Sequence, residues 1–428
     1  MRAAGSGGFR DLFSVGAYRW LFGSNMAFFL AMQSQALVRG FLAFRLTHSE
    51  FALGGVSFAV AVPMLLVSPL GGVLADRVDR RRLIMTAQAL VLVSETTVLA
   101  LYVTGSLVFW HLVAAAIVVG CVFPLMMPAR QAIVANLVGR ERLSSAVAVN
   151  MTGMNTARVV GPALGGVLIL GDDVRLAYFA AIVSYAAALL CMLKIEPARP
   201  PANARRSSPW ASLIEGFTYL IDNRLVALLL LFGLLPMFLA MPFQQLLPAF
   251  AAKVWPVGPN GLGLLSAMVG LGGVVGSLFV AWRGAGGRRL GLQLVSMLGF
   301  GALLIAFCWT PQFPVALAIV FLANTLASVF GTLNSTAIQL LIPDEVRGRV
   351  SSFLMMSFSL PLLGVLPVSY VARELGVREA VSGAALLATL LAGVFYLASP
   401  TLRGADAAVG GAGGERLGPV DSEVTTHQ

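Results

Sequence analysis

The densest group of charged residues in the chain is GGVLADRVDRRRL, at residues 71–83. Two aspartates and four arginines occupy the seven positions from Asp76 to Arg82, although only 11% of the whole sequence is charged. Carboxylates and guanidiniums can make ion pairs and contacts with helix ends, each worth ~0.3–2 kcal/mol. Several such contacts can set the balance between two conformations of similar free energy. We therefore predict that this segment helps to select a conformation.

Glu95 is the one acidic residue, of nineteen, in the middle of a predicted span, MTAQALVLVSETTVLAL. An ionised carboxylate in such a place is costly, so it must be protonated, paired or in contact with water. The pKa of a group of this kind can change with its access to water, which is what a proton carrier requires. Two interpretations remain open: Glu95 carries a transported proton, or it is a permanently protonated side chain bonded to neighbouring Thr or Ser residues.

Three arginines, Arg39, Arg130 and Arg158, also lie in apolar runs. Because arginine keeps its charge, each needs an acid, carbonyl groups, water or an anionic ligand. Arg39 can alternatively reach outward to the interface, and Arg130 can pair with loop acids. Arg158 either balances Glu95 or contacts an acidic group of a substrate in a central cavity. Other candidates for the lining of that cavity can each make an interhelical hydrogen bond instead; they are Gln33, Gln35, Asn155, Gln244, Gln245, Asn324 and Asn334.

Residue types that carry catalysis or bind metals are scattered. The cysteines, Cys121, Cys191 and Cys308, all lie in apolar segments, which is typical of small packed residues. The three histidines form no ligand cluster, and neither lysine stands in a Gly-Lys-Ser/Thr phosphate loop. The formal net charge of +10 comes from short loops rather than from one basic face, which argues against nucleic acid as a partner. We expect no enzymatic activity, no metal and no cofactor.

The elements that position these residues are predicted to be membrane-spanning helices. The mean hydropathy is +0.86, and about 20 apolar residues span a bilayer core. The first apolar run is too long for a cleaved leader, so we interpret it as the first span. Division at charged loops and Gly/Pro breaks predicts an all-α polytopic protein with twelve helices, near 18–44, 51–75, 83–104, 108–137, 144–170, 174–194, 222–251, 261–283, 290–309, 313–341, 350–372 and 379–399.

Arginine and lysine are distributed unequally between the two sets of loops. Five lie in one set: Arg45, Arg175, Lys253, Arg373 and Arg378. Fourteen lie in the other set: Arg77, Arg80, Arg81, Arg82, Arg140, Arg142, Arg199, Arg205, Arg206, Arg283, Arg288, Arg289, Arg347 and Arg349. The positive-inside rule places the richer set, and with it both termini, in the cytoplasm.

The two halves of the sequence are similar. AIVANLVGRERLSSA after the fourth predicted span has a counterpart, AIQLLIPDEVRGRVSS, about 205 residues later. A parallel repeat of this kind predicts two six-helix bundles with a substrate site between them. We expect a cytoplasmic segment at 1–17, a bundle at 18–195, a cytoplasmic linker at 196–221, a second bundle at 222–400 and a disordered cytoplasmic tail at 401–428.

These features resemble the major facilitator superfamily over residues 10–400. The strongest match is the loop at Gly72, LADR and the basic cluster, although Asp79 stands where that superfamily usually has Gly. LTHSEFALGGVSF and LVGRERLSSAVAVNMTG, at 46–58 and 137–153, are most similar to the bacterial branch of enterobactin exporters and macrolide-efflux pumps. The resemblance implies alternating access between the two bundles.

The resemblance gives the charged segment a role as a latch on the cytoplasmic side. It implies that Asp76 meets the amino terminus of the eleventh helix, near Ser351 and Ser352. Arg77, Arg80 and Arg81 can pair with acids or carbonyls of neighbouring helices. Such a latch would favour a state closed on the inside. The alternative is that the arginines only fix the topology.

ARVVGPALGG, at 157–166, resembles the fifth-helix motif of antiporters in the superfamily, with Ala157 in place of its first glycine. Gly161 and Gly165 lie on one helical face and permit close packing, and Pro162 favours a bend. Gly166 completes the motif. An ordinary small-residue helix interface is the alternative.

The sequence therefore predicts a monomeric secondary transporter of the bacterial inner membrane, which exports a small amphipathic molecule of the siderophore or antibiotic type by proton antiport. Its partners would be the substrate, protons and the lipid bilayer. An importer or a lipid transporter of the same fold is the main alternative. A membrane enzyme would need clustered catalytic groups, and a sensor would need a signalling domain.

Overall fold

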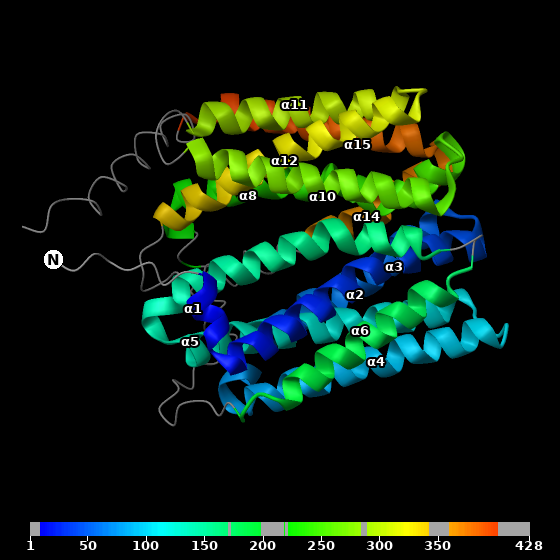
Figure 1. Cartoon of the computed structure of the whole chain (residues 1–428). Coiled ribbons are helices and arrows are strands. Elements are labelled where there is room, and N and C mark those ends of the chain that lie inside the picture. The colour runs from blue at the N-terminus through cyan, green and yellow to red at the C-terminus, as the bar shows by residue number, and fades with distance from the viewer. Residues whose placement is uncertain are drawn as a thin grey trace, which may run out of the picture.

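The computed structural model describes residues 9–169, 173–197, 218, 221–283, 289–341 and 359–400. Regular structure in these ranges is helical, and no strand occurs within them. Figure 1 shows the helices running side by side in two groups, one from each half of the chain. Most of the predicted linker at 196–221, namely 198–217 and 219–220, and the tail at 401–428 lie outside the described residues.

The first half folds into helices that follow the predicted spans closely. They are α1 (Phe9–Ser14), α2 (Gly16–Thr47), α3 (Glu50–Arg77), α4 (Arg80–Val103), α5 (Phe109–Val167) and α6 (Arg175–Leu193). The turn between α2 and α3 is short, because His48 takes a left-handed conformation with φ 51° and ends α2. Asp79 begins α4 by accepting a hydrogen bond from the backbone N–H of Arg82 at 3.0 Å.

The second half repeats this plan with one irregular span. Its elements are α8 (Arg224–Leu239), η1 (Met241–Leu246), α9 (Leu247–Ala249), η2 (Phe250–Val254), α10 (Gly258–Arg283), α11 (Arg289–Trp309), α12 (Phe313–Leu341), α14 (Leu360–Leu375) and α15 (Val377–Ala398). The seventh predicted span corresponds to α8, η1, α9 and η2 in succession. It passes from α-helix through a 3₁₀ turn to a π-helical turn. Prolines along this run remove backbone donors and so interrupt regular helix.

The long helix α5 contains two predicted spans and folds back on itself. A straight helix of 59 residues would extend about 88 Å, far beyond the ~30 Å hydrocarbon core. Its first arm packs along α3, where Gly120 meets the backbone of Val60. Its second arm packs along α2, where Gly165 lies against Ser34. Figure 1 shows the reversal beside α1.

The described residues contain ten helices long and apolar enough to cross a membrane. The returning arm of α5 and the shorter α14 supply the two further predicted spans, so the twelve-helix plan of the sequence fits the structure. The first part of the eleventh predicted span, 350–358, lies outside the described residues.

The hydrophobic cores distinguish the two ends of the molecule. We call the end that carries residues 77–82, the α5 reversal and the start of α11 the basic end, and the other the opposite end. At the basic end each half has its own core, around Tyr18 and Ile133 in one half and Leu229 and Ile338 in the other. At the opposite end one core contains residues of both halves.

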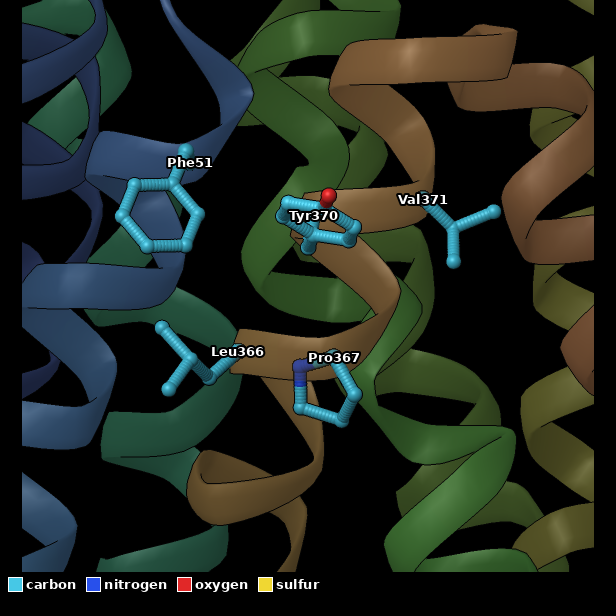
Figure 2. A pocket seen from close by; sticks show the side chains of 5 residues that line it. All are labelled: Phe51, Leu366, Pro367, Tyr370 and Val371. Atoms are coloured by element: carbon cyan, nitrogen blue, oxygen red, sulfur yellow. The ribbon is translucent and has the colours of Figure 1, made fainter.

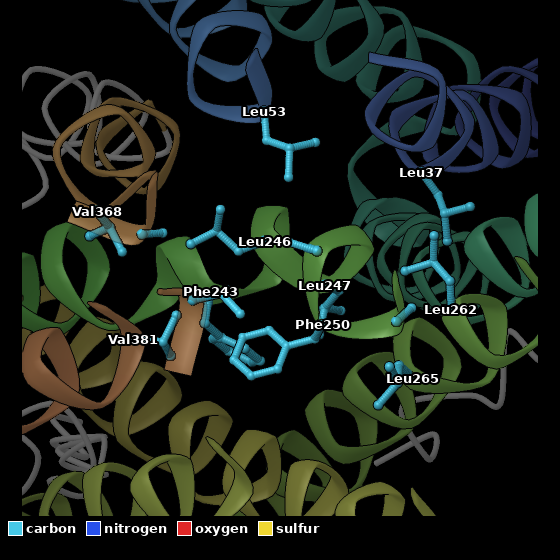
Figure 3. Packing of buried hydrophobic residues seen from close by; sticks show 14 of the residues in the cluster. Leu37, Leu53, Phe243, Leu246, Leu247, Phe250, Leu262, Leu265, Val368 and Val381 are labelled. Carbon is cyan, nitrogen blue, oxygen red and sulfur yellow. The ribbon is translucent and has the colours of Figure 1, made fainter. Parts of the chain in front are cut away.

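Figure 3 shows part of this shared core. Leu53 of the first half points toward Leu246 on the irregular segment of the second half, and Leu37 faces Leu262 of α10. The described apolar packing therefore joins the two bundles at the opposite end.

Candidate functional site

The interior of the first bundle holds a buried ion pair. Arg39 of α2 donates from Nη2 to Oε1 of Glu95 on α4, and the two residues are 5% and 0% exposed. Tyr178 and Tyr185 of α6 lie close enough to interact electrostatically with Arg39. Glu95 Oε2, Arg39 Nε and the Tyr178 hydroxyl have no hydrogen-bond partner among the described residues. The partner of Glu95 is thus Arg39, and the pair lies within one bundle rather than between the two.

Arg130 has a different environment. It is 2% exposed on the first arm of α5, and its guanidinium carbon lies 5.0 Å and 5.5 Å from the ring centroids of Phe28 and Phe29. None of its three nitrogens has a hydrogen-bond partner in the described part of the chain. Cation–π contacts contribute roughly 0.5–2 kcal/mol, which does not replace the lost hydrogen bonds. Arg130 therefore offers unused donors to an anion, a carbonyl group or water.

The antiporter-like motif on the second arm of α5 packs on two neighbours. A Cβ at Gly161 or Gly165 would lie 2.7 Å from Gln33 Cβ or 2.9 Å from Ser34 Oγ, so this face needs glycine against α2. A Cβ at Gly166 would lie 2.6 Å from Gly263 Cα on α10. The motif thus serves both as a contact within the first bundle and as a contact between bundles.

Arg158 lies between these two packed faces. Successive residues of an α-helix lie about 100° apart around its axis. Position 158 therefore falls in a narrow arc of α5, between the face that packs on α2 and the face that packs on α10. Asn155 and Pro162 fall in the same arc. Arg158 is exposed and Asn155 is half-buried. This arc faces the junction of the two bundles, where a central site of such a fold lies.

Polar residues of the second half are paired with one another. Gln244 of η1 donates to the side-chain oxygen of Asn324 at 3.2 Å. Asn334 accepts from Gln293 at 2.8 Å, and the sequence had not singled out Gln293. In the first half, Gln35 donates to the backbone oxygen of Ala177 at 3.2 Å. These contacts agree with the alternative to cavity lining, in which the polar residues make interhelical hydrogen bonds.

The charged segment makes its described contacts within the first bundle. Arg81 donates from Nε and Nη2 to the backbone oxygens of Met192 and Leu193, both at 3.1 Å, and so caps the carboxyl end of α6. Asp79 caps α4, Arg80 is buried, and Arg77 is exposed. The surroundings of Gly72 and the side chain of Asp76 lie outside the described residues, as do Ser351 and Ser352.

The sequence did not single out a second ion pair, at the opposite end. Lys253 Nζ lies 2.5 Å from Glu50 Oε1, and the Glu50 side chain is 4% exposed. Both residues stand at the ends of apolar runs; from the sequence, Lys253 was counted only for the topology and no role was assigned to Glu50. The only hint of this pair in the sequence is the scarcity of lysine, since Lys253 is one of only two lysines in the chain.

A small apolar pocket of about 420 Å³ lies between α3 and α14. It is lined by Phe51, Leu366, Pro367, Tyr370 and Val371. Figure 2 shows Phe51 facing Leu366 and Tyr370 across the junction of the bundles. No charged side chain lines it, so it cannot orient a polar substrate by ion pairing. Within the described ranges, no three His, Cys, Asp or Glu residues gather as metal ligands.

Comparison with known proteins agrees with this architecture. The family model described as transmembrane secretion effector matches residues 11–412. This chain belongs to that family of major facilitator transporters. It is 30% identical over 318 residues to the enterobactin exporter EntS of Citrobacter koseri, which covers 72% of this chain and 73% of the relative. The enterobactin exporter EntS of Escherichia coli O139:H28 matches with the same identity and coverage.

Solved structures match the fold of this secretion-effector chain at low sequence identity. The nucleoside transporter NupG (D323A mutant) superposes with a TM-score of 0.73 at 12% identity, over 89% of this chain and 99% of that one. A bacterial homologue of the human lysosomal transporter Spinster gives 0.73 at 14% identity, over 93% and 99%. The protein is therefore a multi-pass membrane transporter with two six-helix bundles.

Proposed function

We propose that this transporter exports a small amphipathic molecule, of the siderophore or antibiotic type, across the bacterial inner membrane by proton antiport and alternating access. The similarity to enterobactin exporters supports both the direction and the class of cargo. The observation that carries the proposal is the core that joins the two bundles at the opposite end, beside separate cores at the basic end. Two bodies joined at one end are what alternating access requires.

The basic end is assigned to the cytoplasm on the distribution of arginine and lysine. The shared core then seals the external side, and the cargo enters from the cytoplasm between the bundles. Both termini lie in the cytoplasm, and one monomer is the functional unit. A single chain with two bundles supplies both halves of the site.

Arg158 and Arg130 are the proposed contacts for an acidic group of the cargo. Arg158 lies on the arc of α5 that faces the junction of the bundles, and Arg130 has unused donors beside two aromatic rings. A guanidinium next to aromatic faces suits an anionic group attached to an aromatic or apolar body. Asn155, Gln244 and Asn324 would contribute polar contacts to the same region.

Glu95 and Arg39 are the proposed coupling pair. A proton on Glu95 would remove the charge that balances Arg39 within the first bundle. The unbalanced guanidinium would then favour a rearrangement of α2 against α4 that brings it toward water or another acceptor. Loss of the proton would restore the pair.

The proposal is tested by measuring uptake of cargo into everted membrane vesicles from cells that overproduce the transporter. Enterobactin is the first probe cargo, and an imposed proton gradient is the driving force. We expect uptake into everted vesicles that a protonophore abolishes. For Glu95→Gln we expect a loss of gradient-driven transport of at least about tenfold, with gradient-independent exchange of cargo retained.

Other results would change the assignment. Cargo movement in the reverse direction would indicate an importer, and movement unaffected by the protonophore would rule out proton coupling. A matched control is Glu374→Gln, which removes an exposed acid paired with its neighbour Arg373. It should leave transport unchanged.

A further inference from the structure

The ion pair of Glu50 and Lys253 joins the two halves of the chain. The other ion pairs between described residues each lie within one half: Arg39–Glu95, Arg175–Asp173 and Arg373–Glu374. The Glu50 side chain is 4% exposed, whereas that of Lys253 is 50% exposed. The Glu50 carboxylate is therefore enclosed in the interface between the bundles, whereas the Lys253 side chain that contacts it is half-exposed.

Both partners are held by unusual local backbone. Glu50 is the first residue of α3, two positions after the left-handed His48. Lys253 lies on the π-helical turn η2, and such turns occur frequently at functional sites. Its ammonium also lies 5.8 Å from the ring centroid of Phe44. The irregular segment thus brings one cation to one acid and one ring of the other bundle.

Close packing surrounds the pair on both sides. A Cβ at Gly54 of α3 would meet Ser369 and the backbone of Leu366 on α14, so the two helices touch there. A Cβ at Gly40 of α2 would lie 3.7 Å from Pro248. When these surfaces separate, water reaches both charges; while they are closed, the carboxylate depends on Lys253.

We propose that Glu50 and Lys253 form an ionic lock that closes the opposite end of the transporter and must break in every cycle before the bundles part there. The lock rests on the alternating access proposed above. Because the acid is enclosed and the lysine is half-exposed, the pair is stable while the interface is closed, and each partner is hydrated once it opens. This combination suits a gate that opens repeatedly.

The test uses Ser369 as a reporter of opening in the full-length protein. Ser369 is 0% exposed and faces Gly54 in the interface, so a cysteine there should react with N-ethylmaleimide only when the opposite end opens. Ser369→Cys is introduced into otherwise wild-type protein in native membranes. The adduct at position 369 is quantified by peptide mass spectrometry, so the three native cysteines stay in place. The reaction needs no cargo, no gradient and no assigned membrane side.

Glu50→Gln and Lys253→Met should each raise the rate of reaction at position 369 by about tenfold or more. The exchange of charges, Glu50→Lys with Lys253→Glu, should bring the rate back toward that of the reporter alone. The matched control is Asp173→Asn, which breaks the Asp173–Arg175 pair at the same end but within one half. It should leave the rate unchanged.

The lock is overturned if both single variants react at the rate of the Asp173→Asn control, or if the exchanged pair reacts as fast as the single variants. Monodisperse elution in detergent establishes that each variant is folded. Because the readout is independent of cargo and protons, failure of the lock is distinguishable from failure of the proposed export. If the protein does not export the cargo but the variants are labelled at position 369 as expected, the proposed export fails and the lock still holds.

Discussion

Arg130 raises a question at the scale of a single residue, because its burial brings no hydrogen bond within the described residues. An unsatisfied buried polar group costs ~1–3 kcal/mol, and more when it is charged. A residue that lowers stability without a described structural partner is best explained by a role in function. Arg39 differs, because Glu95 balances its charge.

We therefore expect Arg130→Met to stabilise the protein and to impair transport. Methionine fills similar space against Phe28 and Phe29 without a charge. The thermal unfolding midpoint in detergent should rise by a few degrees, while efflux should fall at least about tenfold. Arg81→Met is the matched control, since Arg81 bonds two carbonyls of α6, and its loss should lower the midpoint. A lowered midpoint for Arg130→Met, or unchanged efflux, would contradict the assignment.

At the scale of helices, the end of α3 carries the proposed cytoplasmic latch. Asp76 stands in the last turn of α3, and the resemblance to the superfamily implies a contact with the amino terminus of another helix. Loss of such a charge–dipole contact is worth ~0.3–2 kcal/mol, so Asp76→Asn should reduce transport by about two- to thirtyfold with unchanged expression. Arg82→Gln should leave transport near wild type, because Arg82 is exposed. Equal transport by Asp76→Asn and wild type would remove the latch.

The contact of α5 with α10 makes a second prediction at this scale. Gly166→Leu places side-chain atoms where Gly263 Cα and the Pro259 carbonyl already lie within 3 Å of the added Cβ. Overpacking of this kind costs ~1–3 kcal/mol, so the opposite end should close less well and export should fall about fivefold or more. Gly273→Leu on α10 is the control, since nothing lies within 4 Å of a Cβ there. Normal export by Gly166→Leu would mean that this contact is not needed in the cycle.

For the whole molecule, the sequence predicted the helices better than the pairings between them. Span positions follow from hydropathy and charged loops, which are local, so α4 and α12 begin and end within a few residues of expectation. The partner of Glu95 could not be chosen in this way, because Arg39 is 56 residues away and the choice depends on how α2 and α4 are rotated. The Glu50–Lys253 pair depends on the placement of one bundle against the other, which no local pattern encodes.

The orientation of the molecule in the membrane decides which of its two ends faces the cytoplasm. Helix α4 offers a matched pair of sites, because Arg82 and Ser106 are exposed near its two ends. Its 24 residues extend about 36 Å, enough to cross the bilayer. A membrane-impermeant maleimide should label Ser106→Cys in intact cells and Arg82→Cys only in everted vesicles. Labelling of both positions from the same side would mean that α4 does not span. If Arg82→Cys is labelled in intact cells and Ser106→Cys only in everted vesicles, the orientation in the membrane is the reverse of the one proposed. The Glu50–Lys253 pair would then close the cytoplasmic end, and the arginine distribution would no longer explain the topology.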